Sequence, residues 1–142
     1  MARKPQNVSF SQLIPNLQDH ELIIMCFQEM QRSIRAKFIE RLNTYMVQNG
    51  FNQFGQVHMW EIHLIAFIKS SKKTLLQGQI KTSTKACGMG NLLGNKGAVQ
   101  IIFNYNGKYF NIFGVHLLHG QNNQQKRDEM MEELIQCMKF DR

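Results

Sequence analysis

The dipeptide Asn106-Gly107 predicts a β-hairpin, and with it two adjacent antiparallel strands. Both residues tolerate positive φ, and they join two stretches with a strand pattern, 97–105 and 108–117. Three further strand patterns, at 51–57, 60–69 and 79–86, come before this hairpin without a helical pattern between them. Strands that follow one another through short connections usually pair antiparallel, so we expect a mainly antiparallel sheet.

Two helical patterns and one apolar run complete the expected elements. The segment 21–27 is a short apolar run with polar flanks. This pattern predicts a strand that is buried on both faces, as in the middle of a sheet. Residues 31–48 form an amphipathic helix that ends at Asn49-Gly50, and residues 122–139 form a second helix. The fold class expected is therefore α/β (α+β), one mixed, mainly antiparallel sheet with flanking helices on one side.

The net charge and the hydropathy of the chain limit which classes of partner and which cell compartment we expect for it. Lys and Arg number 17 and Asp and Glu 10, so the formal net charge of +7 favours phosphorylated small molecules, acidic membrane surfaces or nucleic acid. No basic stripe with interleaved aromatic residues supports nucleic acid. The N-terminus resembles no signal peptide, and the longest apolar run, 22–27, is far shorter than the roughly 20 residues of a membrane span. We expect a cytoplasmic protein, with peripheral contact to membranes as an option.

Polar residues that could carry chemistry follow or precede the expected strands. Glu29 directly follows the apolar run, where its carboxylate either binds Mg²⁺ or interacts with the dipole of the next helix. The loop 94–97 (GNKG) either cradles an anion with Lys96 or is an ordinary turn into a strand. His116, at the end of the last strand, either contacts phosphate or transfers protons, or is a hydrogen-bonded core histidine.

The order of three motifs resembles that of a known family. They are FQE at 27–29, GNKGAVQIIF at 94–103 and GVHLLHG at 114–120. Together they resemble the catalytic domain of the inositol polyphosphate 5-phosphatases, in the endonuclease/exonuclease/phosphatase superfamily, from about Leu13 to Lys139. The segments 82–84 and 88–97 resemble the substrate loop of that family, and Arg127 falls where the family has a basic residue.

The resemblance implies an activity and roles for four residues. Glu29 matches a glutamate that helps to bind Mg²⁺, and His116 matches the histidine that contacts the scissile phosphate. Asn95 and Lys96 match the loop that approaches the phosphorylated ring, with Lys96 as the cationic contact. The implied reaction is hydrolysis of the 5-phosphate of phosphoinositides or inositol polyphosphates, with Mg²⁺ neutralising the developing charge.

Several parts of the family pattern are missing from the 142 residues. No first strand ends in the family's asparagine, and neither GDxNxR, PxWxDR nor the C-terminal Asp-His pair is found. We therefore expect residues 1–142 to form a partial domain, with a polar lead-in over 1–12, an incomplete metal site and negligible hydrolysis by the chain alone.

The superfamily packs two sheets face to face between helical layers. A partial four-layer sandwich with one sheet would leave an apolar inner face uncovered, over parts of 62–67 and 99–103. Three explanations stay open: a partial gene product, self-association or a complementing second half through that face, or a degenerate copy. Such a copy would bind phosphoinositides without hydrolysis through Lys81, Lys85, Lys96 and His116. A superfamily nuclease is favoured by the charge alone.

Overall fold

The computed structural model describes residues 9–87 and 96–138 of the chain. Each expected strand and both long helices are present, with small shifts at their ends. The elements are α1 (Phe10–Leu13), η1 (Leu17–Asp19), β1 (Leu22–Phe27), α2 (Arg32–Gln48), β2 (Phe51–Met59), β3 (Ile62–Lys69), η2 (Ser70–Leu75), β4 (Leu76–Ala86), β5 (Gly97–Tyr105), β6 (Lys108–His116), η4 (Gln121–Asn123) and α3 (Gln124–Cys137).

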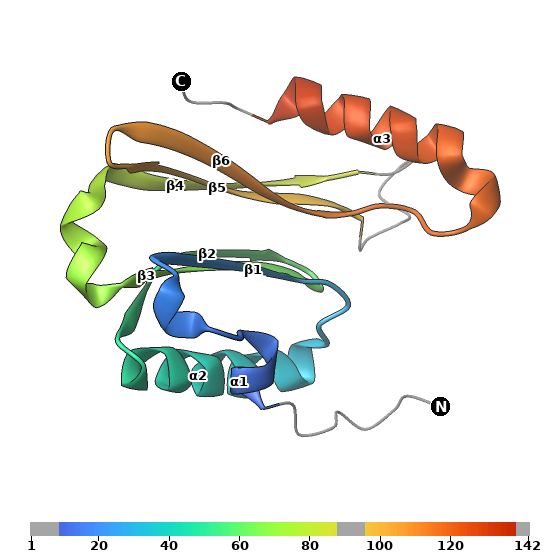
Figure 1. Ribbon diagram of the computed structural model, residues 1–142. Coiled ribbons are helices and arrows are strands. Elements are labelled where there is room, and N and C mark those ends of the chain that lie inside the picture. The colour runs from blue at the N-terminus through green and yellow to red at the C-terminus, as the bar shows by residue number, and fades with distance from the viewer. Residues whose placement is uncertain (1–8, 88–95, 139–142) are drawn as a thin grey trace.

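The strands form two antiparallel sheets rather than one. The first has the order β1-β3-β2 and the second the order β4-β5-β6, and they stack between α2 and α3 as four layers (Figure 1). The four-layer arrangement and the antiparallel pairing are confirmed, whereas the prediction of a single sheet is wrong. The reason is η2, which carries the chain out of the first sheet after Lys69 so that β4 begins the second. Strand patterns do not reveal such a change of sheet.

The two sheets bury each other's inner faces. Ile62, Leu64 and Ala66 of β3 pack with Val99 and neighbouring apolar residues of β5, and these side chains are almost fully shielded from water. Burial of this kind is worth about 1.5–3 kcal/mol for each large aliphatic side chain. The prediction of an uncovered inner face is therefore wrong, and with it the reason given for self-association through that face.

The outer faces are covered by helices, one on each side of the sandwich. Leu42 and Met46 of α2 pack on Phe67 of the first sheet, and Leu134 of α3 packs on Ala98 of the second. The helices thus lie on both sides and not on one. None of the helices in the described ranges is both long and apolar enough to cross a membrane.

The central strands are β3 and β5, which are buried on both faces. The apolar run at 21–27, expected in the middle of a sheet, instead forms the half-buried edge strand β1. The apolar pattern correctly predicted a strand but not its position in the sheet. An edge strand can be apolar on both faces when, as here, α2 covers one face and the second sheet covers the other.

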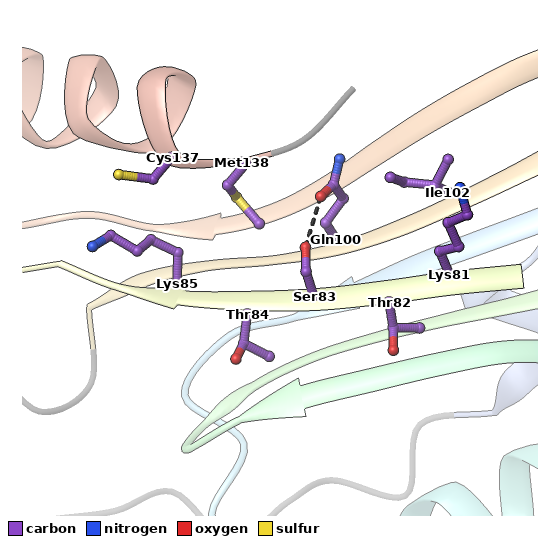
Figure 2. Close-up of a pocket in the computed structure, with 9 residues that line it drawn as sticks. All are labelled: Lys81, Thr82, Ser83, Thr84, Lys85, Gln100, Ile102, Cys137 and Met138. Carbon is purple, nitrogen blue, oxygen red and sulfur yellow. Dashed lines mark hydrogen bonds between the residues drawn. The ribbon is translucent and has the colours of Figure 1, made fainter. Parts of the chain in front are cut away.

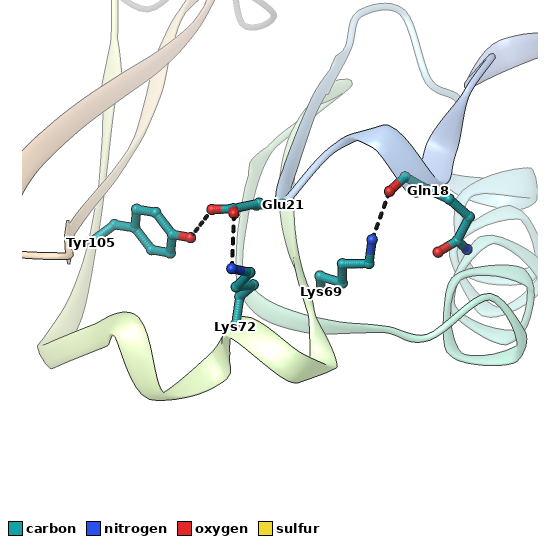
Figure 3. Close-up of polar contacts among 5 residues, drawn as sticks. All are labelled: Gln18, Glu21, Lys69, Lys72 and Tyr105. Carbon is teal, nitrogen blue, oxygen red and sulfur yellow. Dashed lines mark hydrogen bonds and ion pairs between the residues drawn. The ribbon is translucent and has the colours of Figure 1, made fainter.

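Polar contacts join the two sheets at the end where η2 lies (Figure 3). The hydroxyl of Tyr105 in the second sheet donates a hydrogen bond to Glu21, and Lys72 of η2 forms an ion pair with the same carboxylate at 3.2 Å. These partners lower the pKa of Glu21, and the hydrogen bond to Glu21 raises the pKa of Tyr105 to about 12. Nearby, Lys69 Nζ donates to the Gln18 carbonyl at 2.6 Å.

Candidate functional site

The site residues meet at the other end of the sandwich, where β1 and β6 end and β5 begins. Gly97 pairs with His116 in the second sheet, so Lys96 lies beside that histidine. Lys96 Nζ is 2.9 Å from His116 Nε2, and Nε2 is 3.8 Å from Glu29 Oε1. The structure thus brings together three residues singled out in the sequence, from both sheets. The fourth, Asn95, lies outside the described residues.

Lys96 and His116 are buried, whereas the Glu29 side chain is 78% exposed. An ammonium group can only donate hydrogen bonds, so its contact with Nε2 requires that ring nitrogen to be unprotonated. A neutral imidazole does not balance the charge of a buried lysine, and within residues 9–87 and 96–138 Lys96 forms no ion pair with a carboxylate. Because an uncompensated buried charge is costly, this position favours an added anion.

Two glycines permit the close packing that places these residues. Gly97 has φ of 151°, and a Cβ there would lie 2.2 Å from the Lys85 carbonyl oxygen and 2.7 Å from Met59 Cε. A Cβ on Gly114 would lie 2.6 Å from the sulfur of Cys26 across the two sheets. The last glycine of the GNKG loop therefore has a packing role, whatever the loop binds.

Arg127 supports the loop that follows His116. Its guanidinium donates to the carbonyl oxygens of Leu118 at 3.3 Å and Gly120 at 2.7 Å. Arg127 lies in α3, so these bonds tie the helix to the end of β6. This basic residue, noted in the sequence for its position, therefore acts on the backbone of the loop.

The oxygen donors at the site are few for Mg²⁺, which prefers several oxygen ligands in octahedral geometry. Glu29 is the carboxylate that approaches His116. In the part of the chain that the structure describes, no group of three or more His, Cys, Asp or Glu side chains could hold a metal ion. The described residues alone therefore do not fit a resident Mg²⁺.

A cavity of about 540 Å³ lies elsewhere, on the outer face of the second sheet near the end of α3 (Figure 2). Lys81, Ser83 and Lys85 point from β4 toward α3, and Ser83 donates to the buried Gln100 at 2.7 Å. Lys85 forms an ion pair with Glu133 at 2.9 Å. Lys81 and Lys85 thus lie on a different face of the protein from Lys96 and His116. The four residues that the sequence suggested for phosphate binding therefore do not form one site.

The whole chain, residues 1–142, matches the model of the endonuclease/exonuclease/phosphatase family 2. The chain belongs to this family. The resemblance to inositol polyphosphate 5-phosphatases that the motifs indicated is confirmed by the relatives found for it.

Two curated relatives are phosphoinositide phosphatases by name. Phosphatidylinositol 3,4,5-trisphosphate 5-phosphatase 2B of Danio rerio is 27% identical over 88 residues, which are 62% of this chain and 7% of that protein. Polyphosphatidylinositol phosphatase INP53 of Saccharomyces cerevisiae is 31% identical over 84 residues, 59% of this chain and 8% of that protein. The chain thus spans a small part of the length of these relatives.

A solved structure shares the fold. The inositol polyphosphate 5-phosphatase domain of SPsynaptojanin, in complex with inositol (1,4)-bisphosphate and calcium ion, matches with a TM-score of 0.74. The identity is 22%, and the match covers 86% of this chain and 38% of that one. This likeness shows that the two sheets and their helices are arranged as in part of that domain.

Proposed function

We propose that Lys96 and His116, which lie beside Glu29, bind a phosphate group of a phosphoinositide or inositol polyphosphate. In this proposal the chain is the phosphate-binding part of a phosphatase that acts on the 5-phosphate. The observation that supports this proposal is the burial of the Lys96 ammonium group. Its Nζ lies 2.9 Å from Nε2 of His116 and has no carboxylate partner among the described residues. The names of the curated relatives support the substrate class.

The geometry suggests how these side chains would hold a phosphate. Lys96 supplies a positive charge and hydrogen-bond donors, of which one already points at His116. If the ammonium of Lys96 turns from His116 to a phosphate oxygen, Nε2 of His116 could carry a proton and donate to a second oxygen. Glu29 would restrict where an anion can lie, because its carboxylate repels phosphate.

We further propose that this chain does not hydrolyse the phosphate by itself. Glu29 offers one carboxylate of the kind that Mg²⁺ prefers, and the described residues contain no group of three or more His, Cys, Asp or Glu side chains that could hold a metal ion. Catalysis that depends on Mg²⁺ would require further ligands. Binding without turnover is the expected behaviour of the isolated chain.

The direct test is binding to liposomes that contain phosphatidylinositol 3,4,5-trisphosphate. We expect salt-sensitive binding that falls about 10- to 100-fold in Lys96→Ala, because one charge-assisted contact is worth about 1.5–3 kcal/mol. Lys81→Ala is the matched control, since Lys81 lies on the outer face of the second sheet. Equal binding by the wild type and Lys96→Ala would contradict the proposal, as would an equal loss in both variants.

A further inference from the structure

Gln28 joins the two sheets at the edge of the candidate site. Its side-chain Nε2 donates to the carbonyl oxygen of Val115 at 2.5 Å. Gln28 follows the last residue of β1 in the first sheet, and Val115 belongs to β6 in the second. The bond therefore connects the residue before Glu29 with the residue before His116.

Glu29 itself has an unfavourable backbone conformation. Its φ is 56°, in the left-handed region, where a residue with a Cβ costs about 1–2 kcal/mol. Such a conformation persists only where neighbouring contacts impose it. The structure shows one such contact on each side: the Gln28 side chain is bound to Val115, and the Met30 amide donates to the Glu61 carbonyl at 3.1 Å.

The turn that accepts the hydrogen bond from the Met30 amide is itself held by a further hydrogen bond. Trp60 and Glu61 connect β2 to β3, and the guanidinium of Arg35 in α2 donates to the Trp60 carbonyl at 2.8 Å. The segment that carries Glu29 is thus attached to the second sheet through Gln28 and to the first through Met30.

We infer that Gln28 is a positioning residue, which holds Glu29 in its left-handed conformation facing His116. Its role in phosphate binding rests on the function proposed above, whereas its role in holding the segment does not. The opposing interpretation is that an exposed hydrogen bond contributes little beyond general stability. The two interpretations predict different behaviour at Met30 and at the site.

Gln18 provides a matched control for this bond. It too is exposed, and its Nε2 donates to a carbonyl distant in sequence, that of Asn49, at 2.8 Å. This bond lies on the side of α2 where the helix ends, away from Glu29. Gln18→Met and Gln28→Met each remove one bond of the same kind while they retain the length of the side chain.

The first measurement is native-state hydrogen exchange of the Met30 amide by NMR. We expect exchange about 2- to 10-fold faster in Gln28→Met than in the wild type, the range that the loss of one hydrogen bond implies. Gln18→Met should leave the Met30 rate unchanged. Equal Met30 rates in the wild type and Gln28→Met would overturn the inference, and so would equal acceleration by both variants.

The second measurement is the affinity for inositol (1,4)-bisphosphate. Weaker binding by Gln28→Met, by a similar factor, with unchanged binding by Gln18→Met would support a role at the site. Unchanged binding by Gln28→Met would overturn that role. If the wild type binds no inositol phosphate, the proposed function fails, and the exchange rates at Met30 still decide whether Gln28 holds the segment.

Discussion

Lys96 Nζ lies 2.9 Å from Nε2 of His116, and both side chains are buried. Replacement of His116 by Leu would leave the ammonium group without this acceptor in a place where water reaches it poorly. We expect His116→Leu to lower the free energy of unfolding by about 1–3 kcal/mol, the cost of an unsatisfied buried polar group. Urea unfolding of the purified chain measures this.

The same pair should be energetically coupled. Lys96→Met removes the charge, so it should cost at least about 1 kcal/mol less in the His116→Leu background than in the wild type. Additive changes in the free energy of unfolding would show that the contact does not stabilise the fold.

The isolated chain should release no phosphate. Phosphatidylinositol 3,4,5-trisphosphate and Mg²⁺ would be incubated with the 142-residue protein, and free phosphate measured with malachite green. No release above the buffer blank is expected, because the described residues hold no set of three metal-ligating side chains. Turnover that Glu29→Gln abolishes would contradict this prediction.

The left-handed conformation of Glu29 should reverse the usual order of glycine and alanine. At φ of 56° glycine is unstrained, so Glu29→Gly should be more stable than Glu29→Ala by about 1 kcal/mol. At the exposed helical position Glu132 the order should be opposite, with alanine more stable by about 1 kcal/mol. Thermal unfolding of the four variants measures both differences, and the same order at the two positions would refute the strain.

A methyl group at Gly97 should destabilise the protein more than one at Gly50. Both glycines have positive φ, but a Cβ at Gly50 meets nothing within 4 Å, whereas at Gly97 it would overlap the Lys85 carbonyl. We expect Gly97→Ala to cost about 2 kcal/mol more than Gly50→Ala, since overpacking against backbone costs about 1–3 kcal/mol. Equal losses in chemical denaturation would show that the backbone around Gly97 and Lys85 shifts to accommodate the methyl group.

Acidification should destabilise the fold through His63. Burial, together with smaller effects of the nearby His58 and Arg35, lowers the pKa of His63 from 6.5 to about 4. The unfolded chain therefore binds more protons than the native one between these values, so stability is complete above pH 6.5 and falls toward pH 4.

The loss through His63 should reach about 2–3 kcal/mol, since a pKa difference of one unit between the native and the unfolded chain corresponds to about 1.4 kcal/mol. Urea unfolding at pH 7 and pH 5 measures most of this window. His63→Gln should reduce the difference between the two pH values, and an unchanged difference would assign the acid sensitivity to other groups.

The order of the elements followed from local patterns. The Asn106-Gly107 turn, the helix stop at Asn49-Gly50 and the apolar periodicities predicted strands and helices that the structure contains. Glu29, Lys96 and His116 were also recognisable, because each adjoins the end of an expected strand and falls within a motif of the family. These signals depend on neighbouring residues in the chain, which the sequence shows directly.

The type and order of the elements and most of the candidate site were thus predictable from local sequence. Three features were visible only after folding: the strands divide into two sheets, each sheet covers the apolar face of the other, and Lys81 and Lys85 lie apart from Lys96. Gln28 became recognisable there as well, since its acceptor, Val115, is 87 residues away in sequence. Periodicity shows which side of an element is apolar, whereas long-range packing decides which other element covers that side.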